Sequence, residues 1–199
     1  RKIPFSMIYG NHDDMNEITK KEQSDIYRRY PHFVGLHNDV EILKDETFNI
    51  PIYSEDGSEI KFNIWMMDSA WKNKEEDKCY NQVKPEAIEW YKKKSAELKA
   101  QNGGTPVPSL MFQHIPLIEM LDLMEECSKD DEGAVSGPDG KFFKAKPCVD
   151  GEIGEYICTV SQGNGQVEAI KECGDIKAIV FGHDHQNCFI GEVDGVELI

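Results

Sequence analysis

Three short apolar runs are the clearest feature of the hydrophobic pattern. They cover residues 3–9, 109–113 and 176–181, and polar or glycine-containing segments bound them. Runs of this length and composition are typical of β-strands that are buried in a sheet. The pattern therefore predicts three buried strands from distant parts of the chain.

Two hairpins are predicted as well. Residues 48–53 and 60–66 flank an Asp-Gly pair at 56–57, and apolar side chains recur at every second position of the later segment. A second Asp-Gly pair, at 194–195, separates two short segments near the carboxyl end of the chain. Because Asp-Gly favours the tight turn between antiparallel strands, we expect a hairpin at each pair.

Helical periodicity separates these strands. Asp13 or Asn16 can cap a first helix, since both side chains accept hydrogen bonds from a first turn. A longer helix is expected to begin at Pro85, because proline is favoured in the first turn, and to end at a Gly-Gly pair. Shorter helices are predicted at residues 117–124 and 167–173.

The order of elements indicates one domain over residues 1–199. Strands that alternate with helices predict an α/β (α+β layered) fold, in which helices flank a mixed β-sheet sandwich. Residues 128–164 are rich in Gly, Pro, Asp and Lys and lack sustained periodicity, so we predict a long loop insertion there.

Composition narrows the possible partners. The chain has 22 Lys and Arg against 37 Asp and Glu, a formal net charge of -15, which repels a nucleic acid backbone. No apolar stretch approaches the roughly 20 residues that span a bilayer, so no membrane partner is expected. The six cysteines are scattered without a C-x-x-C pair, and we interpret most of them as free thiols.

Side chains that can bind metals directly follow the three buried runs. Gly10-Asn11-His12-Asp13 follows the first run, His114 follows the second, and Gly182-His183-Asp184-His185 follows the third. Since ligands collect at the carboxyl ends of strands in open α/β sheets, we expect these stretches to converge on one site. Imidazole nitrogens with amide or carboxylate oxygens suit zinc, manganese, iron or nickel. His32 and His37 have no such neighbours and are interpreted as ordinary surface or hydrogen-bonded residues.

In this order, G-N-H-D at 10–13, an isolated histidine at 114 and G-H-x-H at 182–185 resemble the calcineurin-like metallophosphoesterases. The sequences F-Q-H-I-P-L and G-H-D-H-Q-N are most similar to the purple-acid-phosphatase-like branch of that superfamily. The resemblance covers nearly the whole chain from residue 3 onward. It implies a metallophosphoesterase-like fold and the hydrolysis of phosphate mono- or diesters by attack of a metal-bridging hydroxide.

The resemblance also implies a role for each of the residues in these sequences. Asn11, His114 and His183 would bind one ion of a two-metal centre, and His185 would bind the other. His12 would contact the substrate phosphate and act as a general acid, with Asp13 orienting its imidazole. The cofactors would be two ions of iron, zinc or manganese, and the partner would be a phosphate ester.

The chain departs from the family pattern at one point. The family's D-x-H and G-D-x-x-D segments, which supply the remaining ligands and the bridging aspartate, normally precede G-N-H-D, and this sequence contains neither. Because the chain also opens on Arg1 and reaches its first predicted strand at once, we expect it to be part of a longer protein. This chain would then carry about half of a two-metal site and would be weakly active or inactive by itself.

Other interpretations follow from the same residues. The fold could serve as a non-catalytic interaction scaffold, but a scaffold needs none of the six implied site residues. A nuclease of the same superfamily is disfavoured by the acidic balance. Trp65 and Trp90 are predicted to lie in the core, as is Trp71, although Trp71 could instead border the pocket. The predicted loop at 128–164 follows the strand of His114, so we expect it to influence substrate choice.

Overall fold

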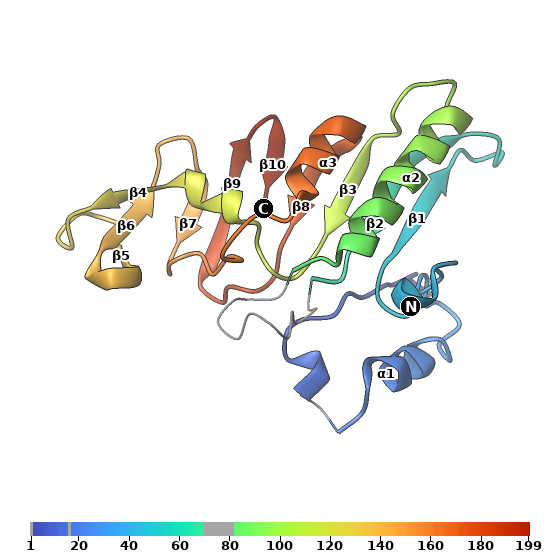
Figure 1. Cartoon of the computed structure of the whole chain (residues 1–199), viewed down its shortest axis with the longest axis horizontal. Helices are drawn as coiled ribbons and strands as arrows, with labels where there is room; N and C mark the ends of the chain where they lie inside the picture. Colours follow the sequence, from blue (N-terminus) through green and yellow to red (C-terminus); the bar gives the residue numbers. More distant parts are fainter. Residues whose placement is uncertain (1, 16, 70–81) are drawn as a thin grey trace.

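The computed structural model describes residues 2–15, 17–69 and 82–199, which form two β-sheets with helices packed on the larger one (Figure 1). The larger sheet has seven strands in the order β1-β2-β3-β8-β10-β9-β7, and the smaller has three in the order β4-β6-β5. The strands are β1 (Phe48–Tyr53), β2 (Ile60–Met66), β3 (Ser109–Phe112), β4 (Met124–Cys127), β5 (Val135–Ser136), β6 (Phe142–Ala145), β7 (Asp150–Ile153), β8 (Ile176–Val180), β9 (Asn187–Val193) and β10 (Val196–Leu198). The predicted mixed α/β architecture is confirmed.

Three α-helices and four 3-10 helices lie in the described part of the chain. The α-helices are α1 (Lys20–Tyr27), α2 (Pro85–Gln101) and α3 (Gln166–Cys173), and the 3-10 helices are η1 (Asp13–Met15), η2 (Glu41–Leu43), η3 (Ile118–Leu123) and η4 (Pro138–Gly140). None of the helices in the described part of the chain is long and apolar enough to cross a membrane.

The centre of the larger sheet is parallel. Strands β2, β3, β8 and β10 run in one direction, whereas β1, β9 and β7 pair antiparallel with their neighbours. The segments that follow β2, β3 and β8 therefore all leave from the side of the sheet where these parallel strands end. We call this side the carboxyl edge; it is the lower edge in Figure 1. The amino-terminal segment with α1 lies below the same edge.

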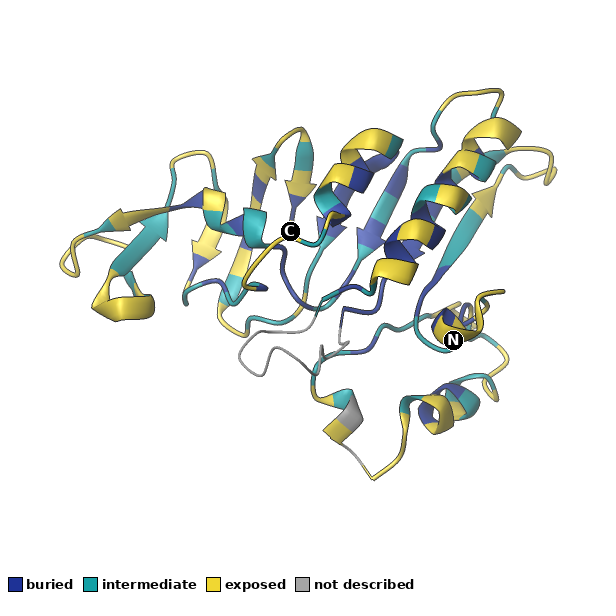
Figure 2. Cartoon of the chain, in the orientation of Figure 1, coloured by how far each residue is buried: buried dark blue, intermediate teal, exposed yellow. Residues whose placement is uncertain are grey.

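The main core lies between α2, α3 and one face of this sheet. The sides of both helices that face the sheet are buried and their outer sides are exposed (Figure 2). Trp65 of β2 is fully buried, and its ring packs edge-on against Trp90 and Tyr91 of α2. The core positions predicted for Trp65 and Trp90 are thus confirmed, whereas Trp71 lies outside the described residues.

Several local predictions are confirmed. The Asp-Gly pairs lie in the β1–β2 and β9–β10 hairpins, and Asp194 and Gly195 both have positive φ angles (54° and 81°), as a tight hairpin turn requires. Pro85 occupies the first turn of α2, and α3 covers the predicted residues 167–173. Cys127, Cys148, Cys173 and Cys188 are free thiols.

The prediction of a strand at residues 3–9 is wrong. The segment makes one isolated bridge, between Phe5 and Phe33, and Ile3 is 58% exposed, although Tyr9 is fully buried. An apolar run shows which side chains can be buried, but a strand also needs a neighbouring strand for its backbone groups. Within the described residues, the larger sheet ends at β1 and offers no such partner.

The first helix begins later than predicted. Thr19 is its N-cap and forms a capping box with Glu22, so Asp13 does not take this role, and Asn16 lies outside the described residues. Residues 117–124 also differ, because they form the 3-10 helix η3 and the first residue of β4 instead of an α-helix.

The segment at 128–164 is more ordered than a long loop. It contains β5 and β6 of the smaller sheet, the 3-10 helix η4, and β7, which extends the larger sheet. These strands have two to four residues, too few for alternation to be visible in the sequence. That the segment is an insertion stays a prediction.

A buried carboxylate joins β2, α2 and β3 at the end of the sheet opposite the site described below. Asp175 is 2% exposed and accepts hydrogen bonds from Tyr91 Oη at 2.5 Å and Trp65 Nε1 at 3.0 Å. Its second oxygen also lies 3.4 Å from Ser109 Oγ. A buried charge is stable only with such partners.

We predict that Asp175→Ala lowers the free energy of unfolding by about 3 kcal/mol, because it leaves buried donors without an acceptor. Tyr91→Phe should cost about 1 kcal/mol, since it removes one donor and leaves the carboxylate its others. Denaturant unfolding would measure both, with exposed Asp130→Ala as the control. Equal stability of Asp175→Ala and the control would contradict the assignment.

Candidate functional site

Three side chains from distant parts of the sequence meet at the carboxyl edge of the larger sheet. His114 Nε2 lies 2.9 Å from Asn11 Oδ1 and 3.3 Å from His183 Nδ1. The two imidazole rings stand edge to face with their centroids 5.1 Å apart. The expected meeting of the three segments at one site is therefore observed.

The segment just after β2 fixes the backbone at His114. Ser69 follows β2 and is 1% exposed, and its hydroxyl oxygen accepts hydrogen bonds from the backbone N–H groups of His114 (3.1 Å) and Ile115 (2.8 Å). Behind this turn, Gln113 Nε2 donates to the Ile115 carbonyl, and Gln166 Nε2 donates to Gln113 Oε1. The backbone that carries the imidazole is held from both sides.

Helix α1 and the buried Tyr9 fix the segment that carries Asn11. Tyr9 Oη donates to the Lys20 carbonyl at 2.8 Å, and Gln23 Nε2 donates to the Asp13 carbonyl at 2.8 Å. A Cβ at residue 10 would lie 3.0 Å from His114 Nε2. Glycine at this position thus lets the backbone pass directly beside the imidazole.

A buried ion pair anchors α1 at the same edge. Lys20 Nζ donates to Asp68 Oδ2 at 2.7 Å, and the side chain of Asp68, directly after β2, is 1% exposed. Beside it, Lys84 pairs with Glu46. Burial raises the pKa of Glu46, and the negative charge of Asp68 raises it further.

Burial also lowers the pKa of both clustered imidazoles. For His114 the next cause is the positive charge of His183, and for His183 the negative charge of Asp184 opposes the effect of burial. Two imidazoles in contact favour the neutral form, which is the form that binds metal ions.

The atoms that meet here suit a metal ion of the first transition series. Ligands at about 2.0–2.1 Å from zinc lie about 3.3 Å apart at tetrahedral angles and about 2.9 Å apart at right angles. The 3.3 Å between the two imidazole nitrogens is close to the tetrahedral value, whereas the 2.9 Å between His114 Nε2 and Asn11 Oδ1 is an ordinary hydrogen-bond length. The set is nevertheless small, because within the described residues no three His, Cys, Asp or Glu side chains form a metal-binding group.

The remaining predicted site residues lie nearby without joining these contacts. His12 is exposed, with Nδ1 3.2 Å from Met15 Sδ, and the Asp13 carboxylate accepts a hydrogen bond from Gly10 N at 2.6 Å. Neither contact joins Asp13 to His12, so the orienting role of Asp13 stays a prediction. The His185 side chain is exposed, and its backbone N–H donates to Glu155 Oε1 at 2.5 Å.

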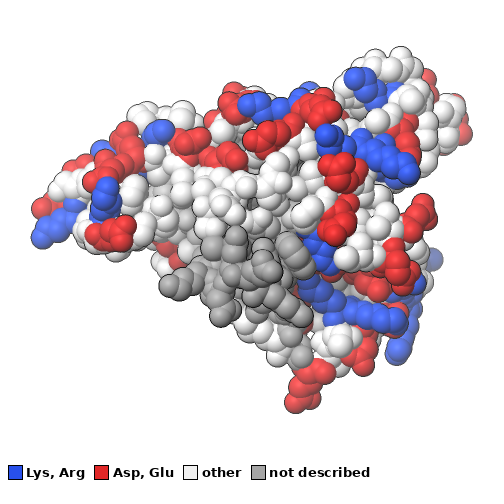
Figure 3. Space-filling view, in the orientation of Figure 1, with Lys and Arg blue, Asp and Glu red and all other residues white. Residues whose placement is uncertain are grey.

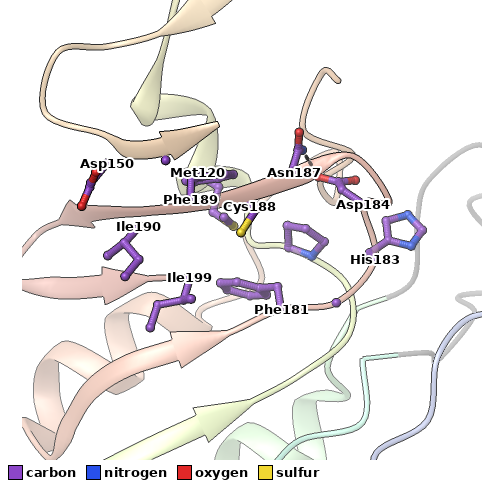
Figure 4. A pocket seen from close by; sticks show the side chains of 13 residues that line it. Met120, Asp150, Phe181, His183, Asp184, Asn187, Cys188, Phe189, Ile190 and Ile199 are labelled. Carbon is purple, nitrogen blue, oxygen red and sulfur yellow. Dashed lines mark hydrogen bonds between the residues drawn. The ribbon is translucent and has the colours of Figure 1, made fainter. Parts of the chain in front are cut away.

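A cavity of about 420 Å³ opens beside His183. Figure 4 shows His183 and Asp184 at one end and Asp150 and Ile190 at the other, with Phe181 between them. No described residue that lines the cavity is Lys or Arg. Its lining includes the apolar side chains of Met120, Phe181 and Ile190, which can contact an apolar group. Asp150 belongs to the segment 128–164 that we expect to influence substrate choice.

Charges of both signs are distributed over the surface. On the face in Figure 3, basic side chains lie among acidic ones instead of forming a continuous stripe. The expectation that nucleic acid is not a partner stays a prediction.

Comparison with known proteins places these residues in context. No family model matches the chain, and no solved structure does. Several relatives have the word phosphatase in their names. It is 25% identical over 212 residues to Probable inactive purple acid phosphatase 29 of Arabidopsis thaliana, covering 99% of this chain and 49% of that protein.

Two further relatives also have the word phosphatase in their names. Probable inactive purple acid phosphatase 14 of Arabidopsis thaliana is 24% identical, over 98% of this chain and 48% of that protein. Phosphatase DCR2 of Saccharomyces cerevisiae is also 24% identical, over 94% of this chain and 30% of that protein. The chain thus spans about half the length of the plant relatives it matches, and these similarities support a metallophosphoesterase-like family.

Sequence reasoning missed the side chains that hold the site in place. Tyr9, Gln23, Ser69 and Glu155 are separated in sequence from the backbone groups they bind. A polar residue just after a strand is a weak signal for Ser69, and no pattern marks the other three.

We predict that the metal-free chain loses stability as the pH falls. Because the pKa of His114 and His183 is below the ordinary value of 6.5 in the folded state, the unfolded chain binds protons first. The free energy of unfolding, measured in EDTA, should therefore decrease from about pH 7.5 to pH 5. His183→Asn should flatten this dependence, whereas exposed His37→Asn should not. Identical pH profiles for both variants and the original chain would contradict the assignment.

Proposed function

We propose that this chain forms part of a metal-dependent phosphoesterase in which Asn11, His114 and His183 hold one metal ion beside a phosphate ester. The meeting of these side chains carries the proposal. The similarity to a yeast protein named as a phosphatase also supports it. Iron, zinc or manganese would suit two imidazoles and an amide oxygen.

The chain's own residues would then have separate roles. His12, which is exposed near the cluster, would protonate the leaving oxygen, because an imidazole exchanges protons near neutral pH. His185 would bind a second ion. When bound, the metal ions would polarise the phosphoryl oxygens and supply the nucleophile. The cavity beside His183 would receive the organic part of a mono- or diester.

Turnover would need more than these residues. Two-metal centres hold their ions about 3.5–4 Å apart, and the family's D-x-H and G-D-x-x-D segments, which would supply the bridging carboxylate, do not occur in this sequence. We therefore propose that this chain binds one ion weakly and hydrolyses little by itself. Catalysis would require a protein that carries those segments as well.

A non-catalytic interaction scaffold is the second candidate. Two observations favour it, since both plant relatives carry the words "probable inactive" in their names and the described residues hold no cluster of three His, Cys, Asp or Glu. A scaffold would keep the sheet and helices without binding a metal ion at His114 and His183.

Calorimetric titration with Zn²⁺ and Mn²⁺ separates the two candidates. We predict about one bound ion per chain, and His114→Ala and His183→Ala should each weaken binding by at least about 10-fold, because a direct ligand matters more than its supporting groups. His37→Ala is the matched control. No saturable binding, or equal affinity in all variants, would favour the scaffold.

Hydrolysis of a chromogenic phosphate ester tests the proposed catalytic activity. The chain alone should give little or no product, whereas a protein that also contains D-x-H and G-D-x-x-D should hydrolyse the ester in a reaction that His12→Ala slows. If that protein binds metal and remains inactive, the phosphoesterase proposal fails.

A further inference from the structure

The loop that carries His183 and His185 is bound by a segment about thirty residues earlier. We call residues 182–187 the histidine loop. Glu155 Oε1 accepts hydrogen bonds from two successive backbone N–H groups of this loop, those of His185 (2.5 Å) and Gln186 (2.8 Å). Two backbone N–H groups of the loop therefore share one side-chain oxygen.

The loop binds back to the same segment. Asn187 Oδ1 accepts hydrogen bonds from the N–H groups of Gly154 (3.0 Å) and Glu155 (3.1 Å). Asp184 Oδ1 accepts one from Cys158 N at 3.2 Å, and Asp184 Oδ2 accepts another from Asn187 Nδ2 at 2.8 Å. Figure 4 shows this last contact as a dashed line. Asp184, the variable residue of G-H-x-H, and Asn187 therefore both help to hold the loop in place.

The two backbones are too close for a side chain at residue 154. A Cβ there would lie 2.5 Å from the Gln186 carbonyl oxygen, a distance that real Cβ atoms do not adopt. Glycine at 154 thus allows the approach on which the Glu155 contacts depend. Strand β7 precedes this segment and pairs with β9, which follows the histidine loop, so both sides of the contact are fixed by the sheet.

We infer that Glu155 is a positioning residue that fixes the histidine loop and so keeps His183 in contact with His114. The inference rests on the proposed function, because it assigns Glu155 a role in metal binding without making it a ligand. Without an oxygen at this position, the N–H groups of residues 185 and 186 would lose their common acceptor and the loop would sample other conformations. The imidazoles would then meet a metal ion less often.

Three substitutions at Glu155 separate the effect of its oxygen position from the effect of its charge. Glu155→Gln keeps an oxygen at the Oε1 position and removes the charge. Glu155→Asp keeps the charge and withdraws the oxygens by one methylene, and Glu155→Ala removes both. A positioning role predicts that the Gln variant resembles the original chain and that the other two do not. Glu152→Ala, an exposed carboxylate in β7, is the matched control.

The first measurement is amide hydrogen exchange by NMR in the metal-free chain. Exchange at residues 185 and 186 should be faster in Glu155→Ala and Glu155→Asp, and unchanged in Glu155→Gln and Glu152→Ala. Unchanged exchange in the Ala and Asp variants overturns the inference. If Glu155→Ala does not fold, Glu155→Asp decides the result.

The second measurement is Zn²⁺ affinity of the same variants. Loss of a supporting group commonly weakens metal binding by about 10- to 100-fold, and we expect this for the Ala and Asp variants, with most of the affinity kept by Glu155→Gln. Faster exchange with unchanged Zn²⁺ affinity overturns the positioning role. A chain that binds no Zn²⁺ refutes the proposed function instead, and exchange at residues 185 and 186 still decides whether Glu155 holds the loop.

Discussion

The parallel register of β3 and β8 is the constraint on which the site depends. Phe112 pairs with Val180, so the two strands end at the same level of the sheet. Beyond them, Gln113 N donates to the Val180 carbonyl and Gly182 N donates to the His114 carbonyl, which extends the pairing to the residues that carry the imidazoles. Two histidines about seventy positions apart therefore leave the sheet side by side.

Side-chain acceptors then convert this rough placement into a defined cluster. Ser69 binds two successive N–H groups beside His114, and Glu155 binds two successive N–H groups beside His185. In both cases one oxygen satisfies backbone groups that have no partner in the sheet, which rigidifies a turn at the strand end. The same arrangement recurs at both histidine-bearing strand ends, although the acceptors come from the segment after β2 in one case and from the segment after β7 in the other.

The sequence predicted the parts of this arrangement that rest on local chemistry. Apolar runs located β3 and β8, Asp-Gly pairs located both hairpins, and Pro85 located the start of α2. The stretches that contain Asn11, His114 and His183 were located by their places after apolar runs, and the family resemblance singled out these three residues within them. The strand predicted at residues 3–9 was wrong, because strand pairing depends on a neighbouring strand that an apolar pattern does not reveal. The short strands within 128–164 and the acceptor Glu155 were missed for a related reason, since long-range contacts determine both.

The most direct test of the account is whether the imidazoles of His114 and His183 are in contact in solution. In the metal-free chain, ring protons of these two histidines should show a nuclear Overhauser cross-peak, because their centroids are 5.1 Å apart. His114→Asn and His183→Asn would assign the signals. A cross-peak that disappears in either variant is the predicted result, and its absence in a folded chain with sharp imidazole signals would contradict the site.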